Sequence, residues 1–375
     1  MMQAVESERG VLTSLARLGK NLAASLIGIA VTLLLLEGGL RLVNFSNDAR
    51  VLVYPRIGNE INGFRNPDFS RDIPRGQFRI LALGASAFVT REFQPRFQDL
   101  LDEAPIFTSS GFHARVISSG VPAHMTFDSL WKYEYWYRGY DLDLVIFYHG
   151  INDARANSYP DDLFQEDYTQ LLYYRQYAPL FAWAAAHPRV SESFVVMLVR
   201  KLITWWRLRS DPLFAKGPYN DPRNDPWLVE GANVKTAMVF RRNLEAVLDI
   251  AKERGQRVLL LTYAYYLPDD YTNERFLEKK TDYSFMPESV ATEVWGIKEN
   301  VVAAIVAHNE VVREVASRHP EALFFDMERF MPKDRRHFID ICHWTDLGRK
   351  VFARGVLKAL DEQGADLLER ARARD

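Results

Sequence analysis

Four short stretches of the sequence carry residues whose types could perform acyl-transfer chemistry. In chain order they are Ser86 in LGAS, Gly120 in SSGV, Asn152 in GIND, and Asp340 with His343 in DICH. A serine hydroxyl becomes a nucleophile when a base removes its proton, and a third group must orient that base. His343 could be the base, and Asp340 could accept a hydrogen bond from its second ring nitrogen. These residue types predict a Ser-His-Asp triad.

A tetrahedral intermediate also needs donors for its oxyanion, and each fixed donor is typically worth about 3–4 kcal/mol. The backbone N–H groups of Ser86 and Gly120 and the side-chain amide of Asn152 could provide three of them. A glycine at position 120 would let the backbone come close to a substrate. We interpret Asp153 as a structural residue that bonds loop amides, and His308 as a packing residue. The sequence has no metal-ligand spacing and no phosphate loop, so we expect no metal and no cofactor.

The elements that must position these residues alternate from residue 79 onward. Apolar runs predict strands at 79–84, 114–119, 142–148, 257–264 and 322–327, and helical periodicity predicts helices near 92–103, 127–138, 236–253, 297–317 and 345–360. Several of these strands are apolar without alternation, as strands covered on both faces are. The pattern predicts an α/β fold with a five-stranded, mainly parallel sheet. Because ligands bind at the carboxyl ends of such strands, the four stretches should converge there.

In this order, the four stretches resemble the sequence blocks of the SGNH hydrolases, the GDSL esterase and lipase family. GIND is similar to the family's G-x-N-D block, and DICH, continued by WTDLGRKVFA, is similar to its D-x-x-H block. The resemblance covers about residues 78–363 apart from an aromatic-rich insertion. It implies a three-layer αβα sandwich and assigns the triad and the oxyanion hole to the same residues as above.

The first block departs from the family's usual Gly-Asp-Ser, because it reads Gly84-Ala85-Ser86. The missing Asp is not the triad acid, so its loss leaves loop geometry and substrate preference open without excluding catalysis. The elbow of the α/β-hydrolases, G-x-S-x-G, is excluded, since Phe88 occupies the position of its second glycine.

The N-terminal part of the chain has a different character. Residues 21–43 carry no charge from Leu22 to Leu36, and Glu37 and Arg41 lie one helical turn apart. About 22 helical residues reach roughly 33 Å, which is enough to cross a bilayer. We predict an uncleaved membrane anchor, a short cytoplasmic tail at 1–20, and a main domain on the periplasmic or extracytoplasmic side. A cleaved signal peptide and a buried core helix are the alternatives.

The remaining boundaries follow from composition. Residues 44–77 are predicted to be a stalk that wraps the next domain, 78–363 the hydrolase domain, and 364–375 a C-terminal tail. An insertion at about 154–235 is rich in Tyr, Trp, Phe and Pro. Its stretch 194–209, FVVMLVRKLITWWRLR, fits a lid, a docking surface, an interfacial membrane helix, or a helix packed on the sheet. A net charge of −2 and the lack of a basic block give no case for nucleic acid.

These observations predict a membrane-anchored serine esterase of the cell envelope. It would hydrolyse short acyl or acetyl esters of glycans or lipids through an acyl-Ser86 intermediate. Two alternatives remain open at this point. One is a polysaccharide O-acetyltransferase that uses the same triad, and the other is a non-catalytic binding or assembly protein on the same scaffold, for which Ala85 is the main support.

Overall fold

The computed structural model describes residues 2–47, 70–88, 93–120, 122–171, 193–209, 230–286 and 288–375, together with residues 183, 186, 187 and 190. The chain divides into two units, Met1–Arg56 with Gln176–Asp211, and Ile57–Arg175 with Pro212–Asp375. All the candidate site residues belong to the second unit. Residues 48–69 of the predicted stalk and most of 172–229 of the predicted insertion lie outside the described residues.

The second unit is built on one parallel sheet. Its strands are β1 (Gln77–Gly84), β2 (His113–Ser118), β3 (Leu144–Tyr148), β4 (Arg257–Leu261) and β5 (Leu323–Phe325). They are arranged in the order β2-β1-β3-β4-β5, and every neighbouring pair is parallel. This sheet confirms the predicted α/β fold and matches the fold that the resemblance to the SGNH hydrolases implies.

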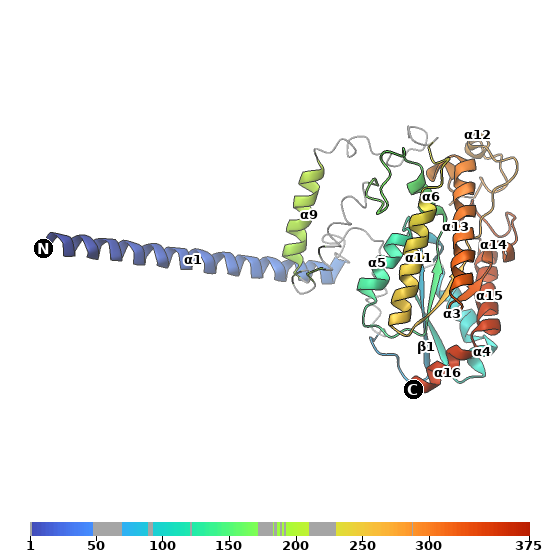
Figure 1. Cartoon of the computed structure of the whole chain (residues 1–375), viewed down its shortest axis with the longest axis horizontal. Helices are drawn as coiled ribbons and strands as arrows, with labels where there is room; N and C mark the ends of the chain where they lie inside the picture. Colours follow the sequence, from blue (N-terminus) through green and yellow to red (C-terminus); the bar gives the residue numbers. More distant parts are fainter. Residues whose placement is uncertain are drawn as a thin grey trace. The chain divides into compact units, whose positions relative to one another are not determined.

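Helices cover both faces of the sheet (Figure 1). The longer ones are α3 (Gln94–Asp102), α11 (Thr236–Glu253), α13 (Lys298–Arg318) and α15 (Asp346–Gln363), and shorter ones are α4 (Pro105–Thr108), α5 (Thr126–Trp131), α6 (Ile151–Asn157), α12 (Asn273–Leu277), α14 (Met327–Phe330) and α16 (Ala365–Arg374). One turn of 3₁₀-helix, η2 (Ser86–Phe88), follows β1, and another, η4 (Thr292–Val294), precedes α13. A π-helical turn, η3 (Lys132–Trp136), continues α5. The three predicted layers are therefore present.

Alternation along each strand divides the apolar core between the two faces. Ile80 and Ala82 of β1 join the core beneath α3 and α15, whereas Leu81 and Leu83 join the core beneath α5 and α11. Successive side chains of a strand point to opposite faces, so a strand buried on both sides has to be apolar throughout. That requirement explains the continuous apolar runs of the sequence.

The strand order creates a crevice at the carboxyl end of the sheet. From β1 the chain crosses to β2 on one side through α3, and it then crosses past β1 to β3 through α5 on the other face. Right-handed crossovers in opposite directions must lie on opposite faces, so the loops after β1 and β3 separate and leave room between them. Ser86 follows β1, and Gly150 and Asn152 follow β3.

Ser70 and the C-terminal segment are both bonded at the opposite edge of the sheet. The buried guanidinium of Arg79 donates hydrogen bonds to the carbonyl oxygens of Ser70 at 3.0 Å and Asp141 at 3.2 Å, so Ser70 of the predicted stalk is joined to this domain. The predicted C-terminal tail contains helix α16, whose Arg374 donates to the carbonyl of Gln77 at 2.8 Å and pairs with Asp143.

The first unit contains helix α1 (Met2–Asn47) and helix α9 (Phe194–Leu208). Within α1, the stretch Gly19–Leu42 is long and apolar enough to cross a membrane, and it overlaps the predicted anchor at 21–43. Residues 2–20, predicted to be a tail, continue the same helix. Helix α9 contacts α1 and runs across it rather than along it (Figure 1).

Candidate active site

The structure brings the predicted nucleophile, base and acid into one chain of hydrogen bonds. Nε2 of His343 lies 2.8 Å from Oγ of Ser86, and Nδ1 of His343 lies 2.7 Å from Oδ2 of Asp340. Ser86 and His343 are 257 residues apart in the sequence and meet because both follow the carboxyl ends of strands. A proton on Nδ1 leaves the lone pair of Nε2 facing the serine hydroxyl, which is the arrangement that activates a nucleophile.

A tight loop holds Asp340 in the orientation that His343 requires. Oδ1 of Asp340 accepts the backbone N–H groups of Cys342 at 2.9 Å and His343 at 2.8 Å, and Oδ2 also accepts the N–H of Val290 at 3.1 Å. Burial raises the pKa of the Asp340 carboxyl, but the hydrogen bond from His343 and the backbone N–H donors outweigh it and hold the pKa below its usual range. The acid therefore stays ionised and faces the base.

Asp340 also makes His343 a stronger base than an ordinary histidine. Burial lowers the pKa of the imidazole, yet the Asp340 carboxylate raises it above the ordinary value of 6.5. The neighbouring Cys342 is buried, and this burial raises the pKa of its thiol to about 11. That thiol is neutral at pH 7, so the carboxylate is the group that shifts His343.

Asn152 is held by two buried neighbours that the sequence analysis did not select. Its Nδ2 donates to the carbonyl of His124 at 2.9 Å, and its Oδ1 accepts from Nε1 of Trp295 at 2.9 Å. With one amide hydrogen and the oxygen engaged, the second amide hydrogen has a fixed direction and is the one that can serve an oxyanion. Trp295 is buried beside the triad, with its ring centroid 6.3 Å from that of His343. No motif marks Trp295, which is 143 residues from Asn152.

Contact between two loops requires a glycine at position 120. A Cβ at this position would lie 2.3 Å from the carbonyl carbon and oxygen of Phe88, so the backbone of the loop after β1 excludes any side chain. The predicted approach of this backbone to a substrate stays a prediction. The N–H of Gly120 makes a long contact of 3.5 Å to Oγ of Ser118, and that hydroxyl donates to the carbonyl of Phe88.

A buried lysine fixes the peptide unit that precedes Gly120. The ammonium of Lys132 donates to the carbonyl oxygen of Ser119, and its side chain is 1% exposed. The carbonyl of Ser119 and the N–H of Gly120 belong to one planar peptide and point in opposite directions. A cation on the oxygen side therefore orients the N–H and strengthens it as a donor. No sequence motif marks Lys132.

The loop after β3 packs equally closely on the end of β4. A Cβ at Gly150 would lie 2.5 Å from Cγ of Tyr263, whose ring stacks on Tyr148 with centroids 4.7 Å apart. The carbonyl of Gly150 lies 3.1 Å from Nδ1 of His308, and Nε2 of His308 lies 2.9 Å from Oγ1 of Thr236. His308 is thus the packing residue that was predicted, and it also supports the Asn152 loop.

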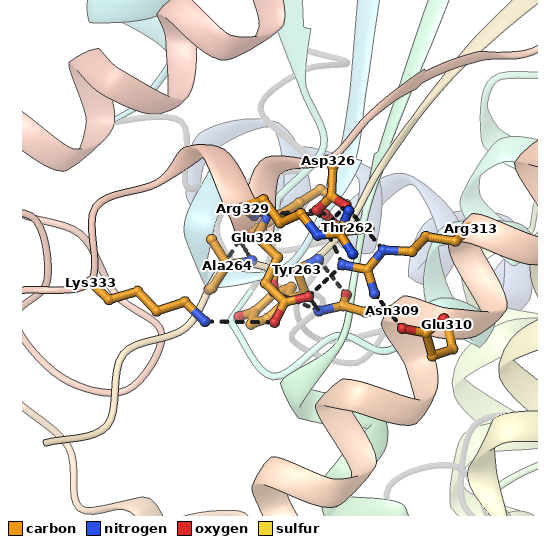
Figure 2. A network of polar contacts seen from close by, with 11 residues as sticks. Thr262, Tyr263, Ala264, Asn309, Glu310, Arg313, Asp326, Glu328, Arg329 and Lys333 are labelled. Atoms are coloured by element: carbon orange, nitrogen blue, oxygen red, sulfur yellow. Dashed lines mark hydrogen bonds and ion pairs between the residues drawn. The ribbon is translucent and has the colours of Figure 1, made fainter. Parts of the chain in front are cut away.

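A network of charged and polar side chains is bonded to the backbone of Tyr263 (Figure 2). Asn309 accepts the N–H of Tyr263 at 2.6 Å and donates to its carbonyl at 3.0 Å, and it also donates to Glu328 at 2.9 Å. Arg313 pairs with Asp326 at 3.0 Å and with Glu328 at 2.7 Å. The network joins α13 to the residues that follow β4 and β5, and it fixes Tyr263, against which Gly150 packs.

Asp153 has the structural role that was predicted. It accepts hydrogen bonds from the N–H of Thr126 at 3.1 Å, from the hydroxyl of Thr126 at 2.6 Å, and from the hydroxyl of Tyr168 at 2.9 Å. Burial raises the pKa of the Asp153 carboxyl to about 7. This residue ties the start of α5 to α6.

Asp340, Cys342 and His343 place one potential metal-ligand atom each within 4.8 Å of one another. The Asp340 oxygens, however, already accept four hydrogen bonds, including the one from His343. A metal ion would have to break the contact that orients the base. The cluster therefore fits the triad better than it fits a metal centre.

Comparisons with known proteins give matches at the level of fold. No family model and no curated protein matches the sequence. Solved structures similar to this chain include a putative acylhydrolase from Bacteroides fragilis, with 11% identity, a TM-score of 0.40, and coverage of 80% of this chain and 94% of that one. A GDSL-like lipase from Bacteroides thetaiotaomicron has 11% identity, a TM-score of 0.39, and coverage of 80% and 96%.

A catalytic mutant of an acetylxylan esterase from Geobacillus stearothermophilus has 12% identity, a TM-score of 0.41, and coverage of 77% and 95%. Matches this distant carry no argument about what the present chain binds or does. The class of the protein rests on its own structure, which is a doubly wound α/β domain with a Ser-His-Asp triad at the carboxyl edge of the sheet.

The raised pKa of His343 predicts the direction of the pH dependence. The base form is the unprotonated imidazole, so the rate of ester hydrolysis should increase as the pH rises, with a midpoint above pH 6.5. At pH values below this midpoint the imidazole is protonated and the rate should be low. Asp340→Asn should lower the pKa of His343 and reduce kcat by about 10³–10⁴-fold. The measurements are the pH profile of kcat/KM and an NMR titration of His343. The control Asp346→Asn changes an exposed acid, and equal His343 pKa values in wild type and Asp340→Asn would contradict the assignment.

Because Trp295 donates a hydrogen bond to Asn152, removing this donor should lower the catalytic rate without weakening substrate binding. Trp295→Phe keeps an aromatic ring but removes the donor, so kcat should fall about 10-fold while KM changes less than about 2-fold. Trp344→Phe is the matched control, because the buried Nε1 of Trp344 has no hydrogen-bond partner among the described residues. Steady-state kinetics on a small ester distinguish the two variants, and an equal loss in both would refute the positioning role.

Proposed function

We propose that this chain is a serine ester hydrolase of the SGNH type. The observation that carries the proposal is the position of His343, which bridges Ser86 at 2.8 Å and Asp340 at 2.7 Å. A histidine with an ionised, buried acid on one nitrogen and a serine hydroxyl on the other has the arrangement needed for nucleophilic catalysis. A non-catalytic scaffold would place no demand on this geometry.

The mechanism follows from these contacts. His343 removes the proton from Oγ of Ser86 as the oxygen attacks the ester carbonyl carbon. The oxyanion that forms is held by the second amide hydrogen of Asn152 and by the N–H groups of Ser86 and Gly120. The N–H of Gly120 gives up only its 3.5 Å contact with Ser118 to do so.

The intermediate then collapses in two stages. His343 transfers its proton to the leaving alcohol, and the carbon–oxygen bond to that alcohol breaks, which leaves an acyl-Ser86 ester. A water molecule, deprotonated by His343, attacks the acyl-enzyme, and the return of the proton to Ser86 releases the carboxylic acid. Asp340 remains ionised throughout and stabilises the imidazolium that forms in each stage.

The surroundings of the acid loop support a substrate larger than a simple ester. A hollow of about 920 Å³ is lined by aromatic and charged side chains, which include Tyr265, Tyr266, Phe285, Lys280, Asp282 and Lys333. The backbone N–H of Tyr266 donates to the carbonyl of Ile341 at 3.0 Å, so the hollow lies against the Asp340–His343 loop. Aromatic faces and polar groups together are suited to a glycan, and we propose acetylated glycans of the cell envelope as the substrate class.

We also propose that α1 anchors the chain in a membrane, with the second unit on the extracytoplasmic side. The apolar stretch Gly19–Leu42 supports the anchor. Protease accessibility of the second unit in sealed vesicles of known orientation tests the side.

If His343 activates Ser86, a fluorophosphonate should label this serine. The wild-type chain should be labelled at Ser86, because only an activated serine reacts, and Ser86→Ala should abolish both labelling and ester hydrolysis. Ser317→Ala, which changes an exposed serine on α13, is the control and should keep both. Equal hydrolysis by wild type and Ser86→Ala would remove the triad as the catalytic site. Adding a glycan acceptor to the same assay separates an esterase from an acetyltransferase by the fate of the acyl group.

If glycans bind in the hollow, a change to its lining should weaken the binding of a large substrate but not of a small one. Phe285, which is 52% exposed, offers a ring for sugar stacking, so Phe285→Ala should raise KM for an acetylated oligosaccharide by about 5-fold. The kcat/KM for a small aryl acetate should stay unchanged. Phe330→Ala alters an exposed phenylalanine outside the residues that line the hollow and is the control. A parallel loss on both substrates in Phe285→Ala would contradict a role in glycan binding.

A further inference from the structure

Helix α9 exposes a band of apolar side chains. Four of them are largely accessible, namely Val199 at 48%, Leu202 at 54%, Ile203 at 45% and Trp206 at 73%. Spacings of three and four residues place these side chains on one side of the helix. An exposed apolar band of this kind is rare in soluble proteins and marks a contact with another protein or with a membrane.

The start of α9 is fastened to the apolar helix α1 by Glu37. The carboxylate of Glu37 accepts the hydroxyl of Ser193 at 2.9 Å and the backbone N–H groups of Phe194 at 3.1 Å and Val195 at 3.0 Å. These N–H groups belong to the first turn of α9, which lacks internal partners and carries a partial positive charge. Arg41 pairs with the same carboxylate at 2.7 Å, and its guanidinium lies over the ring of Phe194 at 5.2 Å.

This attachment fixes the depth of α9 relative to the possible membrane span. Glu37 lies near the C-terminal end of the stretch Gly19–Leu42, where a spanning helix leaves the hydrocarbon and enters the headgroup layer. From that point α9 runs across α1 (Figure 1). A helix that crosses a membrane-spanning helix at this level runs along the membrane surface rather than through it.

The charges of α9 suit the headgroup layer. The stretch 194–209 contains four basic residues, Arg200, Lys201, Arg207 and Arg209, and no acidic residue. Arg200 stacks on the ring of Trp183 at 3.9 Å. Basic residues beside a band of Leu, Ile and Trp are the pattern of a helix that lies in the interface of an anionic bilayer.

A second copy of the chain or a soluble partner could also cover an apolar band. Neither of them requires the band to begin at the end of an apolar span, and neither accounts for a helix sequence with four basic residues and no acidic residue. The bilayer accounts for the depth, for the apolar band and for the charge together. The structure therefore favours a lipid bilayer as the surface that covers the apolar band of α9.

We propose that α9 lies in the interface of the membrane that α1 enters, with Val199, Leu202, Ile203 and Trp206 in the acyl-chain boundary. The net positive charge of the helix complements anionic headgroups, and Glu37 joins the interfacial helix to the anchor. This inference rests on the proposed insertion of α1 and is independent of the esterase activity. It assigns a lipid surface to a segment whose composition alone left four readings open.

The proposal is tested by measuring the depth of single fluorophores in the full-length protein. Leu202→Cys and Trp206→Cys are labelled with the dye NBD and reconstituted in phosphatidylcholine–phosphatidylglycerol vesicles, with or without brominated acyl chains. Leu34→Cys in α1 reports the anchor, and Met238→Cys in α11, an exposed apolar position at 64%, is the matched control. The native Cys342 is fully buried and should not react, which labelling of the unaltered chain verifies.

Brominated lipid should reduce emission by about half at positions 34, 202 and 206 and leave position 238 unchanged. Quenching at 34 without quenching at 202 and 206 would overturn the interfacial helix and leave the anchor standing. A lack of quenching at all three positions would overturn both. Protection of 202 and 206 from aqueous iodide without quenching by brominated lipid would show that protein covers α9, and this too would overturn the proposal.

Discussion

The hydrogen bond between His343 and the buried Asp340 is the contact on which the rest of the site depends. It fixes the ring orientation, places the free lone pair on Nε2, and raises the basicity of the imidazole. The bond exists because the loop folds back on the carboxylate, which receives the backbone N–H groups of Cys342 and His343. Without those donors a carboxyl buried to this degree would lose its charge.

The opposite wall of the site depends on close contact between loops. Gly120 and Gly150 are glycines because the backbone of Phe88 and the ring of Tyr263 leave no room for a Cβ. Lys132 and Trp295 then orient the donors on these loops through a carbonyl oxygen and an amide oxygen. Donors fixed before a substrate arrives need no reorganisation when charge develops, which is the main reason that such sites accelerate reactions.

In the first unit, the carboxylate of Glu37 lies near the C-terminal end of the apolar stretch Gly19–Leu42. The first turn of α9 and Arg41 bond this charge. The same contacts that stabilise Glu37 decide where α9 begins. Helices α1 and α9 are therefore joined at Glu37, although 156 residues separate Glu37 from Ser193.

The sequence by itself determined the elements of this protein. Continuous apolar runs and helical periodicity predicted the sheet, and residue types after each strand predicted Ser86, Asn152, Asp340 and His343, because strand ends must converge at one edge. The tertiary structure alone decided the neighbours of those residues. The roles of Trp295 and Lys132 and the packing constraint on Gly120 arise from contacts between segments far apart in the chain, where no local pattern records the partner. Helix α9 had the composition of several kinds of helix, and its contact with Glu37 was decided only by packing.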